Sequence, residues 1–497
     1  MGRQSKGHAI MISVPYQGHI NPFINLALKL ASKGFTITFA HLEFVHQKLS
    51  KAHHSSNGTE VDLFTQARES GLDIRYATFS DGFPLEFDRE LNFDEYWEII
   101  LRDFAGLVDE FIGKTIQSEP FIVPFLVTDI VFYPWPAIIA DKYDIVNVAF
   151  WTQPALVFSL ACHWELLREN GHFPCEDNVE EEINYIPGVK SINTRDIMSY
   201  LKEAGSASVV FKCLPMATEG IKKADFILHN TVDELESDII SALNKYQPNY
   251  AIGPINFSRN LATYTVSKSL RSESDCTQWL ESKSPGSVLY VSFGSFVHTS
   301  KQIIEEIAYG LLLSEVNFIW VIREGILGSG DTNVLPVGFE DEIKDEGLIV
   351  PWCDQIMVLS DPAVGGFLTH NGWNSTVESM WCGVPMICYP IAYDQITNAK
   401  LVVDDWKIGI RLCDQGMSVD RKVVAEKIKS FMSGGSISKN LRVEADRVKE
   451  TMRDALESDG SSERNFDKCI EDLEAKIHVK TTKVNECQPT GDASSSQ

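Results

Sequence analysis

The sequence predicts an α/β protein built from two doubly wound parallel sheets. Three observations support this fold class. Short apolar runs alternate with helical stretches through the first 254 residues, the alternation stops in a Ser/Thr/Asn-rich stretch, and it restarts in the second half. Such alternation is typical of parallel sheets with helices on both faces. With 497 residues, the chain is also long enough for two separate cores.

The first half contains one clear helix and several apolar strands. A helix is predicted over 21–34, because Pro22 suits a first helical turn and Gly34 suits a helix end. The strands are predicted over 8–14, 35–41, 125–132 and 224–231. The strand at 125–132 carries a single carboxylate, Asp129.

The second half repeats this pattern. Strands are predicted over 287–295, 317–324, 347–353, 364–370 and 385–390, and helices over 301–314 and 377–383. A charged helix and a polar tail, which we expect to be disordered, follow at the end of the chain. The predicted units are an N-terminal domain (1–254), an interdomain linker (255–272), a C-terminal domain (273–460), a C-terminal helix (461–478) and the tail (479–497).

Composition restricts the possible partners. The net charge of -25 and the pI near 4.9 disfavour binding to nucleic acid or to an anionic membrane. No apolar stretch is long enough for a transmembrane helix, and the N-terminal apolar run is too short for a signal peptide. Ten cysteines lack paired or metal-binding spacing, so we expect reduced thiols and a cytoplasmic protein. Nothing indicates the subunit number, and we expect a monomer.

One strand-to-helix corner, "THNGWNSTVESM" at 369–380, gathers polar side chains. In doubly wound sheets, ligands bind at the carboxyl ends of the strands. The free N–H groups at the start of the following helix would form an anion site, to which His370, Asn374 and Ser375 add donors. The alternative is that Ser375 and Glu378 form only a capping box at the helix start.

A candidate acid–base pair lies in the N-terminal domain. His19 follows the first predicted strand, and Asp129 lies near the end of another. A buried aspartate needs a partner, and a His–Asp pair meets that need. Asp129 would fix the tautomer of His19 and stabilise its imidazolium, while the other ring nitrogen takes a proton from a hydroxyl. The alternative for His19 is a structural role, which is commoner for a histidine in a loop.

A dinucleotide-binding loop is disfavoured. Gly325, Gly328 and Gly330 precede "DTNVLP" rather than a helix, so the Gly-x-Gly-x-x-Gly fingerprint of a Rossmann-type oxidoreductase is missing. These glycines indicate a surface loop.

The window 352–395, "WCDQIMVLSDPAVGGFLTHNGWNSTVESMWCGVPMICYPIAYDQ", closely resembles the signature box of plant UDP-sugar glycosyltransferases. The resemblance extends to "PYQGHINP", "FWT", "WLESKSPGSVLYVSFGS" and "FIWVIRE", and so covers nearly the whole chain. It implies two facing Rossmann-like domains of the GT-B type. It also implies a nucleotide sugar bound to the C-terminal domain, and transfer with inversion at the anomeric carbon.

The resemblance also implies roles for individual residues. Trp352 would stack on uracil beside Gln355, and Glu378 would bind the ribose. His370, Asn374 and Ser375 would contact the pyrophosphate, which Ser295 approaches from the other side. His19, paired with Asp129, would be the base. The sugar would be contacted by Thr152, Trp373, Asp394 and Gln395. A glutamine at 395 resembles glucose-preferring members.

A few residues depart from the family pattern. Asp354 stands where Pro or Ser is usual, Trp381 and Cys382 replace small residues, and Cys388 lies on the next strand. We interpret Trp381 as core packing and the cysteines as buried apolar filler. Aromatic residues are frequent in the first half, and sequence alone does not separate core residues from those lining an acceptor pocket. They are Phe83, Phe87, Tyr96, Trp97, Phe132, Tyr133, Trp135, Trp151, Phe158 and Trp164.

These observations predict an inverting, UDP-glucose-dependent hexosyltransferase that acts on a hydroxyl of a small apolar acceptor. No cofactor beyond the donor substrate is expected. The chain contains no Asp-x-Asp, the usual carboxylate clamp of metal-dependent glycosyltransferases, so we also expect no metal. The alternative is a UDP-sugar-binding sensor or partner protein with little turnover.

Overall fold

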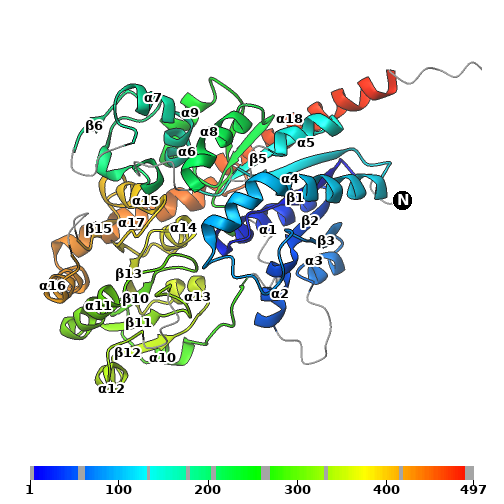
Figure 1. Cartoon of the computed structure of the whole chain (residues 1–497). Helices are drawn as coiled ribbons and strands as arrows, with labels where there is room; N and C mark the ends of the chain where they lie inside the picture. Colours follow the sequence, from blue (N-terminus) through cyan, green and yellow to red (C-terminus); the bar gives the residue numbers. More distant parts are fainter. Residues whose placement is uncertain are drawn as a thin grey trace, which may run out of the picture.

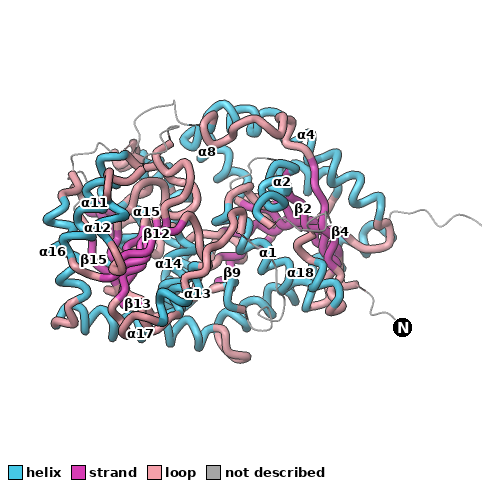
Figure 2. The backbone as a smooth tube through the Cα atoms, turned by 90° about the horizontal axis from the view of Figure 1, so that it is seen from below, coloured by secondary structure: helices cyan, strands magenta, loops and turns pink. Residues whose placement is uncertain are grey.

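The computed structural model describes residues 5–53, 62–130, 135–174, 180–202, 209–258, 269–328, 334–413 and 418–486. Two parallel sheets with helices on both faces form the two lobes of the molecule (Figure 1). In the view from below, the sheets occupy opposite halves (Figure 2). The predicted class of two doubly wound α/β domains is therefore confirmed.

The first sheet joins seven parallel strands in the order β3-β2-β1-β4-β5-β8-β9. The chain order reverses between β1 and β4, and the crevice outside such a reversal is the usual ligand site of these folds. The strands are β1 (His8–Ile12), β2 (Thr36–Leu42), β3 (Ile74–Phe79), β4 (Pro124–Asp129), β5 (Val146–Trp151), β8 (Phe226–His229) and β9 (Asn249–Ala251).

The second sheet joins six parallel strands in the order β12-β11-β10-β13-β14-β15. Its order reverses between β10 and β13, so each sheet has one such crevice. The strands are β10 (Val288–Ser292), β11 (Asn317–Val321), β12 (Gly347–Val350), β13 (Val364–Thr369), β14 (Met386–Cys388) and β15 (Gly409–Arg411). A short antiparallel pair, β6 (Glu182–Ile183) and β7 (Ile192–Asn193), lies outside both sheets.

Helices connect these strands. Those up to the linker are α1 (Gln17–Ser32), α2 (Glu43–Ala52), α3 (Thr65–Glu69), α4 (Phe93–Ser118), α5 (Trp135–Tyr143), α6 (Ala155–Cys162), α7 (Trp164–Glu169), η1 (Thr194–Asp196), η2 (Ser199–Leu201), α8 (Val209–Ile221), α9 (Asp233–Leu243) and η3 (Ile255–Phe257). Those after it are α10 (Thr277–Glu281), α11 (Lys301–Ser314), α12 (Phe339–Ile343), α13 (Gln355–Ser360), α14 (Trp373–Cys382), α15 (Gln395–Lys400), η5 (Leu401–Asp405), α16 (Arg421–Met432), α17 (Ser436–Ala455) and α18 (Ser461–Glu486). No described helix combines the length and apolar character needed to span a bilayer.

The predicted elements differ from the observed ones mainly at their ends. The predicted strand 287–295 stops at Ser292, because Gly294 adopts a positive φ of 74° that ends the extended backbone. The helix predicted from residue 21 begins at Gln17, so His19 lies in the first turn of α1 rather than in a loop. Of the predicted linker 255–272, residues 259–268 lie outside the described residues.

The last helix returns to the first lobe. α18 packs against β9 and β5 of the first sheet (Figure 1). It continues past the predicted end at residue 478 to Glu486, so the first residues of the predicted tail are helical, whereas 487–497 lie outside the described residues. Lys480 holds this extension, because its ammonium donates to Asp144 at 2.9 Å and to the Ile145 carbonyl at 3.1 Å.

A buried ion pair fastens α18 to α1. Lys29 donates to Glu463 at 2.6 Å, with side chains only 5% and 15% exposed. Burial lowers the pKa of Lys29, and the Glu463 carboxylate partly offsets that effect. The ammonium also lies 4.5 Å from the centre of the Phe466 ring. The lobes are further joined by one apolar cluster that includes Trp151 and Ile227 from the first sheet and Trp373 and Val377 from α14.

The Lys29–Glu463 pair generates a stability prediction. Lys29→Met should lower the free energy of unfolding by about 2–4 kcal/mol, because it leaves a largely buried carboxylate without its partner. The matched control is Lys6→Met, since Lys6 pairs with Glu474 at the same 2.6 Å but on the exposed surface; it should cost about 0–1 kcal/mol. Chemical denaturation measures both changes, and equal losses would contradict a special role for the buried pair.

Candidate active site

A cavity of about 780 Å³ lies between the two lobes. Its walls come from segments that follow the carboxyl ends of the strands in both sheets, where doubly wound folds place their ligands. All predicted site residues except Asp129 line it: His19, Thr152, Ser295, Trp352, Gln355, His370, Trp373, Asn374, Ser375, Glu378, Asp394 and Gln395. Residues predicted from distant parts of the sequence therefore share one cavity.

His19 and Asp129 form a close pair on the wall of the first lobe. Nδ1 of His19 lies 2.6 Å from Oδ2 of Asp129, whose side chain is 1% exposed. Thr152 Oγ1 lies 3.2 Å from the same ring nitrogen. Because Nδ1 faces Asp129, Nε2 is the ring nitrogen left for a reacting group. The hydroxyl of Thr152 thus contacts the His19–Asp129 pair.

The surroundings of His19 favour its charged form. Burial disfavours the imidazolium, but the Asp129 carboxylate outweighs that effect and Asp394 adds to it, so the pKa of His19 is raised. Asp394 belongs to the second lobe, so the electrostatics of this histidine depend on both lobes. Burial in turn raises the pKa of Asp394.

The corner at 369–380 presents a bare helix start to the cavity. α14 begins at Trp373 with Gly372 as its N-cap, and no side chain caps its N–H groups. Ser375 and Glu378 lie inside the helix and do not form the capping box considered as the alternative. Both instead accept hydrogen bonds from the Gln355 amide, at 2.9 Å and 2.7 Å. The N–H groups at this end are therefore available to an anion.

His370 is held between two glycines. A Cβ added at Gly294 or Gly372 would come within 2.4 Å or 2.5 Å of its Nε2 atom, so only glycine leaves room for the ring. Burial lowers the pKa of His370 to about 4. The imidazole is therefore neutral near pH 7.

Two contacts join the helix start of α14 to the first lobe. Nδ2 of Asn374 donates to the Gly18 carbonyl at 2.8 Å, and the Trp373 indole N–H donates to the Asn230 carbonyl at 2.8 Å. Gly18 can accept this bond because the residue four positions on in α1 is Pro22, which has no N–H. The indole N–H of Trp373 is already used, so it is not a free donor for a sugar.

The loop that carries Asp394 and Gln395 is tightly bonded. The Gln395 side-chain oxygen accepts from the backbone N–H groups of Ile391 and Ala392 at 2.9 Å and 3.0 Å. The Asp394 carboxylate accepts from Asn398 at 2.7 Å. The amide nitrogen of Gln395 is therefore the part of this side chain left for a ligand.

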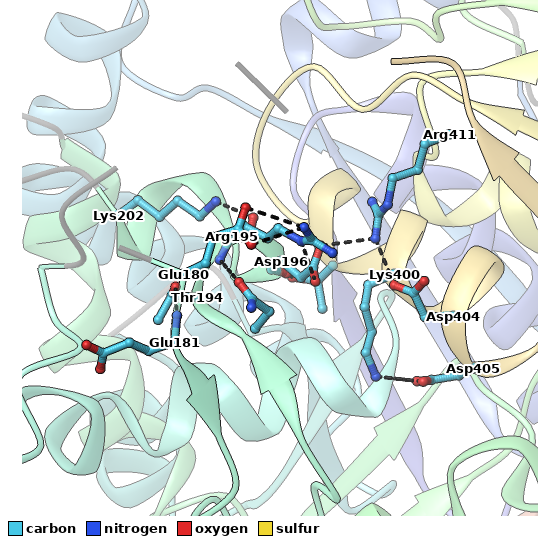
Figure 3. A network of polar contacts seen from close by, with 12 residues as sticks. Glu180, Glu181, Thr194, Arg195, Asp196, Lys202, Lys400, Asp404, Asp405 and Arg411 are labelled. Atoms are coloured by element: carbon cyan, nitrogen blue, oxygen red, sulfur yellow. Dashed lines mark hydrogen bonds and ion pairs between the residues drawn. The ribbon is translucent and has the colours of Figure 1, made fainter. Parts of the chain in front are cut away.

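The first lobe also holds this loop, through a contact that sequence reasoning missed. Ser199 exchanges hydrogen bonds with the Tyr393 backbone, donating its N–H at 3.1 Å and accepting at its hydroxyl at 2.8 Å. Nearby, buried Asp196 pairs with Arg411 at 3.1 Å, and Arg411 also pairs with Asp404 at 2.8 Å (Figure 3). Ser199 and Tyr393 are 194 residues apart and Asp196 and Arg411 are 215 apart, so no local pattern could reveal these two contacts.

The aromatic residues separate into two groups. Trp97, Trp151 and Phe158 line the cavity, whereas Tyr96 and Trp135 are buried in the apolar core of the first lobe. Phe132 and Tyr133 lie outside the described residues. Phe83, Phe87 and Trp164 pack against the cores. An aromatic contact that the sequence did not indicate crosses the crevice, with the Tyr16 and Phe296 ring centres 4.6 Å apart.

The residues that depart from the family pattern have structural partners. Asp354 caps α13 by accepting from the Met357 N–H at 3.0 Å. Trp381 stacks on Phe257, with ring centres 4.5 Å apart. Cys388 is buried, and Asn371 donates to its sulfur at 3.3 Å, so it is more than apolar filler. The free thiols in the described part of the chain are Cys162, Cys276, Cys353, Cys382, Cys388, Cys413 and Cys469.

Comparisons with known proteins agree with this geometry. The family model described as UDP-glucoronosyl and UDP-glucosyl transferase matches residues 268–443. UDP-glycosyltransferase 86A1 of Arabidopsis thaliana is 49% identical over 97% of this chain and 98% of its own. The 7-deoxyloganetin glucosyltransferase of Catharanthus roseus is 36% identical over 95% and 97%. Phytolacca americana UGT2, solved with UDP-2-fluoro-glucose and pterostilbene, matches with a TM-score of 0.74 at 25% identity, over 94% of this chain and 99% of that one.

The chain belongs to the plant UDP-glycosyltransferases and has their GT-B fold. The family resemblance predicted from the sequence is thereby confirmed, as is its consequence that the protein is a glycosyltransferase using a UDP-sugar and a small acceptor.

The space around His370 can be tested by substitution. Gly294→Ala should lower the free energy of unfolding by about 2–4 kcal/mol, through its positive φ and the clash with His370. The matched control is Gly338→Ala, where φ is also positive, at 82°, but no atom lies within 4 Å of the added Cβ; it should cost about 1–2 kcal/mol. Chemical denaturation and nucleotide binding are the measurements. Equal losses of unfolding free energy in the two variants would show that the His370 ring does not require glycine at position 294.

Proposed function

We propose that this protein is an inverting UDP-glucose-dependent glucosyltransferase that transfers glucose to a hydroxyl of a small apolar acceptor. One observation carries the proposal: the His19–Asp129 pair and the uncapped start of α14 face the same cavity from opposite lobes. A base and an anion-binding helix end in one cavity are what transfer from a nucleoside diphosphate sugar requires.

The proposed donor site lies on the second lobe. Trp352 stacks on uracil beside Gln355, and Glu378 binds the ribose hydroxyls. The diphosphate lies at the start of α14, against His370, Asn374, Ser375 and Ser295. Asp394 and the Gln395 amide nitrogen hold the sugar, and Thr152 borders it. Two relatives that bear the name glucosyltransferase support glucose as the transferred sugar.

The proposed reaction is a single displacement. Nε2 of His19 takes the proton of the acceptor hydroxyl as its oxygen bonds to the anomeric carbon. The electron pair of the broken bond leaves with UDP, so an α-linked donor gives a β-glucoside. Asp129 holds the imidazole with Nδ1 protonated and stabilises the imidazolium that forms. We propose no metal in this step, since the described residues contain no cluster of three His, Cys, Asp or Glu side chains that could hold one.

We also retain the proposals of a cytoplasmic monomer and of a chain divided at the linker. The free thiols of the described cysteines support the cytoplasmic location, and the two separate sheets support the division at the linker.

A direct assay tests the function. The protein is incubated with UDP-glucose and a panel of phenolic, terpenoid and hormone-like alcohols in the presence of EDTA. Products are read by mass spectrometry, and the anomeric configuration by NMR. A β-glucoside is expected. UDP-glucose binding without transfer to any acceptor would favour the sensor alternative, and an α-glucoside would overturn the inverting displacement.

The dyad generates a prediction on pH. His19→Ala should lower kcat by about 10²-fold or more and leave UDP affinity nearly unchanged. His19 acts only when deprotonated, and its pKa is raised above the ordinary histidine value of about 6.5. The kcat/KM of the wild type should therefore fall at low pH, and this fall should begin at a higher pH than for an ordinary histidine. Asp129→Asn should lower kcat and move this acid limb to lower pH. An acid limb that stays in place in the asparagine variant would contradict the pairing.

The loop that carries Asp394 and Gln395 leads to a prediction on donor choice. The wild type should use UDP-glucose with at least about tenfold higher kcat/KM than UDP-galactose, because the wrong epimer leaves buried polar groups unpaired. Gln395→Glu keeps an oxygen for the Ile391 and Ala392 N–H groups but removes the amide donor. It should reduce the preference more than it weakens UDP binding. An unchanged ratio would show that Gln395 does not read the sugar.

A further inference from the structure

The proposed donor site holds a multiply charged anion without a lysine or arginine among the described residues of its wall. Among the described residues that line the cavity, none is Lys or Arg, whereas Glu273, Asp354, Glu378 and Asp394 are carboxylates. The whole chain carries a net charge of -25. His370 is neutral at pH 7, because burial lowers its pKa to about 4. The helix start of α14 supplies only a partial positive charge.

One cation is buried directly behind this wall. Arg323, just after β11, is 2% exposed and does not itself line the cavity. Its guanidinium donates to the backbone carbonyls of the loop that follows β10, at 3.2 Å to Gly294 and 2.8 Å to Phe296, and it also donates to Val297. That loop lines the cavity from Gly294 to Val297.

Arg323 has hydrogen bonds but no ion-pair partner among the described carboxylates. Its partners in the described structure are all backbone carbonyls, including Glu324 at 3.2 Å, and no described carboxylate lies within ion-pair distance. Burial lowers its pKa to about 10, so it stays charged at neutral pH. A buried charge without a partner normally costs several kcal/mol. The positive charge of Arg271, whose guanidinium lies 5.7 Å from the Trp352 ring centre, also lowers the pKa of Arg323, and the Glu90 carboxylate offsets only part of these effects.

We propose that the missing counter-charge of Arg323 is the diphosphate of the donor. The inference rests on the proposed donor site. Arg323 is a positioning residue, because its hydrogen bonds order the loop at 294–297. Its positive charge also attracts the diphosphate through that loop. The substrate thus supplies the close opposite charge that the free protein lacks, since Glu90 offsets only part of the cost of burial.

The same charge acts on the leaving group. When the bond from the anomeric carbon breaks, its electron pair goes to the β-phosphate oxygen, so UDP carries one more negative charge than the diphosphate of the bound sugar nucleotide. A fixed cation in a buried site stabilises that developing charge without reorganisation. Loss of the charge at Arg323 should therefore lower kcat as well as the affinity for UDP.

A comparison of UDP binding with uridine binding distinguishes an electrostatic role of Arg323 from a purely structural one. Uridine carries the base and ribose but no phosphate. Calorimetry on the full-length wild type, Arg323→Gln and Arg323→Lys gives the dissociation constants. We expect UDP binding to weaken about tenfold or more in Arg323→Gln, which corresponds to roughly 1.4 kcal/mol, and clearly less in Arg323→Lys. Uridine binding should stay within about twofold in both.

Arg421→Gln is the matched control, since it removes one positive charge from the same lobe at a residue outside the cavity lining. It should leave both ligands unaffected. Should the glutamine protein not fold, Arg323→Met replaces it, because this variant also removes the charge and retains an apolar stem.

Equal weakening of UDP and uridine in Arg323→Gln would overturn the inference, since it would mean that Arg323 only supports the loop. Unchanged UDP binding and kcat in the neutral variant would overturn it too. If the wild type binds uridine and UDP equally, the proposed diphosphate subsite itself fails, and the inference with it.

Discussion

The hydrogen bond from Asn374 to the Gly18 carbonyl joins the first turns of α1 and α14, the two helix starts that face each other across the crevice. Gly18 is adjacent to His19, and Asn374 lies in the first turn of the uncapped helix. Pro22 leaves the Gly18 carbonyl without its partner inside the helix, so the bond satisfies a carbonyl that would otherwise be unpaired. The contact thereby places the proposed base opposite the proposed anion site.

The parallel sheets explain why the remaining groups meet at this crevice. β1 and β4 are neighbours in register, with Ile12 opposite Thr128, so His19 and Asp129 both follow the same sheet edge. In the second sheet, β10 is paired with β13 in the same way, and their ends carry the Gly294 loop and His370. Because the strands within each of these two sheets are parallel, the loops at their carboxyl ends lie at one edge of that sheet, and the two edges face the crevice. Residues far apart in sequence are therefore collected without any long insertion.

Burial affects the charge state of the ionisable groups at this crevice as much as the charges of their neighbours do. His370 lines the cavity and is neutral, whereas the charged Arg323 lies behind the loop that forms the cavity wall. His19 shows the opposite arrangement, because a buried carboxylate and Asp394 of the other lobe raise its pKa. An acidic chain thus places a buried cation behind one wall of the cavity and a histidine with a raised pKa on the wall of the other lobe.

The sequence by itself determined the two-sheet α/β class, the UDP-glycosyltransferase family and a set of candidate site residues, of which all but Asp129 line the cavity. Those features rest on local periodicity and on one long signature window. Only the tertiary structure decided that Ser375 and Glu378 bond to Gln355 instead of capping α14, that the Trp373 indole N–H is already paired, and that α18 returns to the first lobe. It also decided which aromatic residues line the cavity and that Ser199 holds the loop of Asp394. These contacts join residues tens to hundreds of positions apart, and their partners depend on how the lobes pack, which no local pattern encodes.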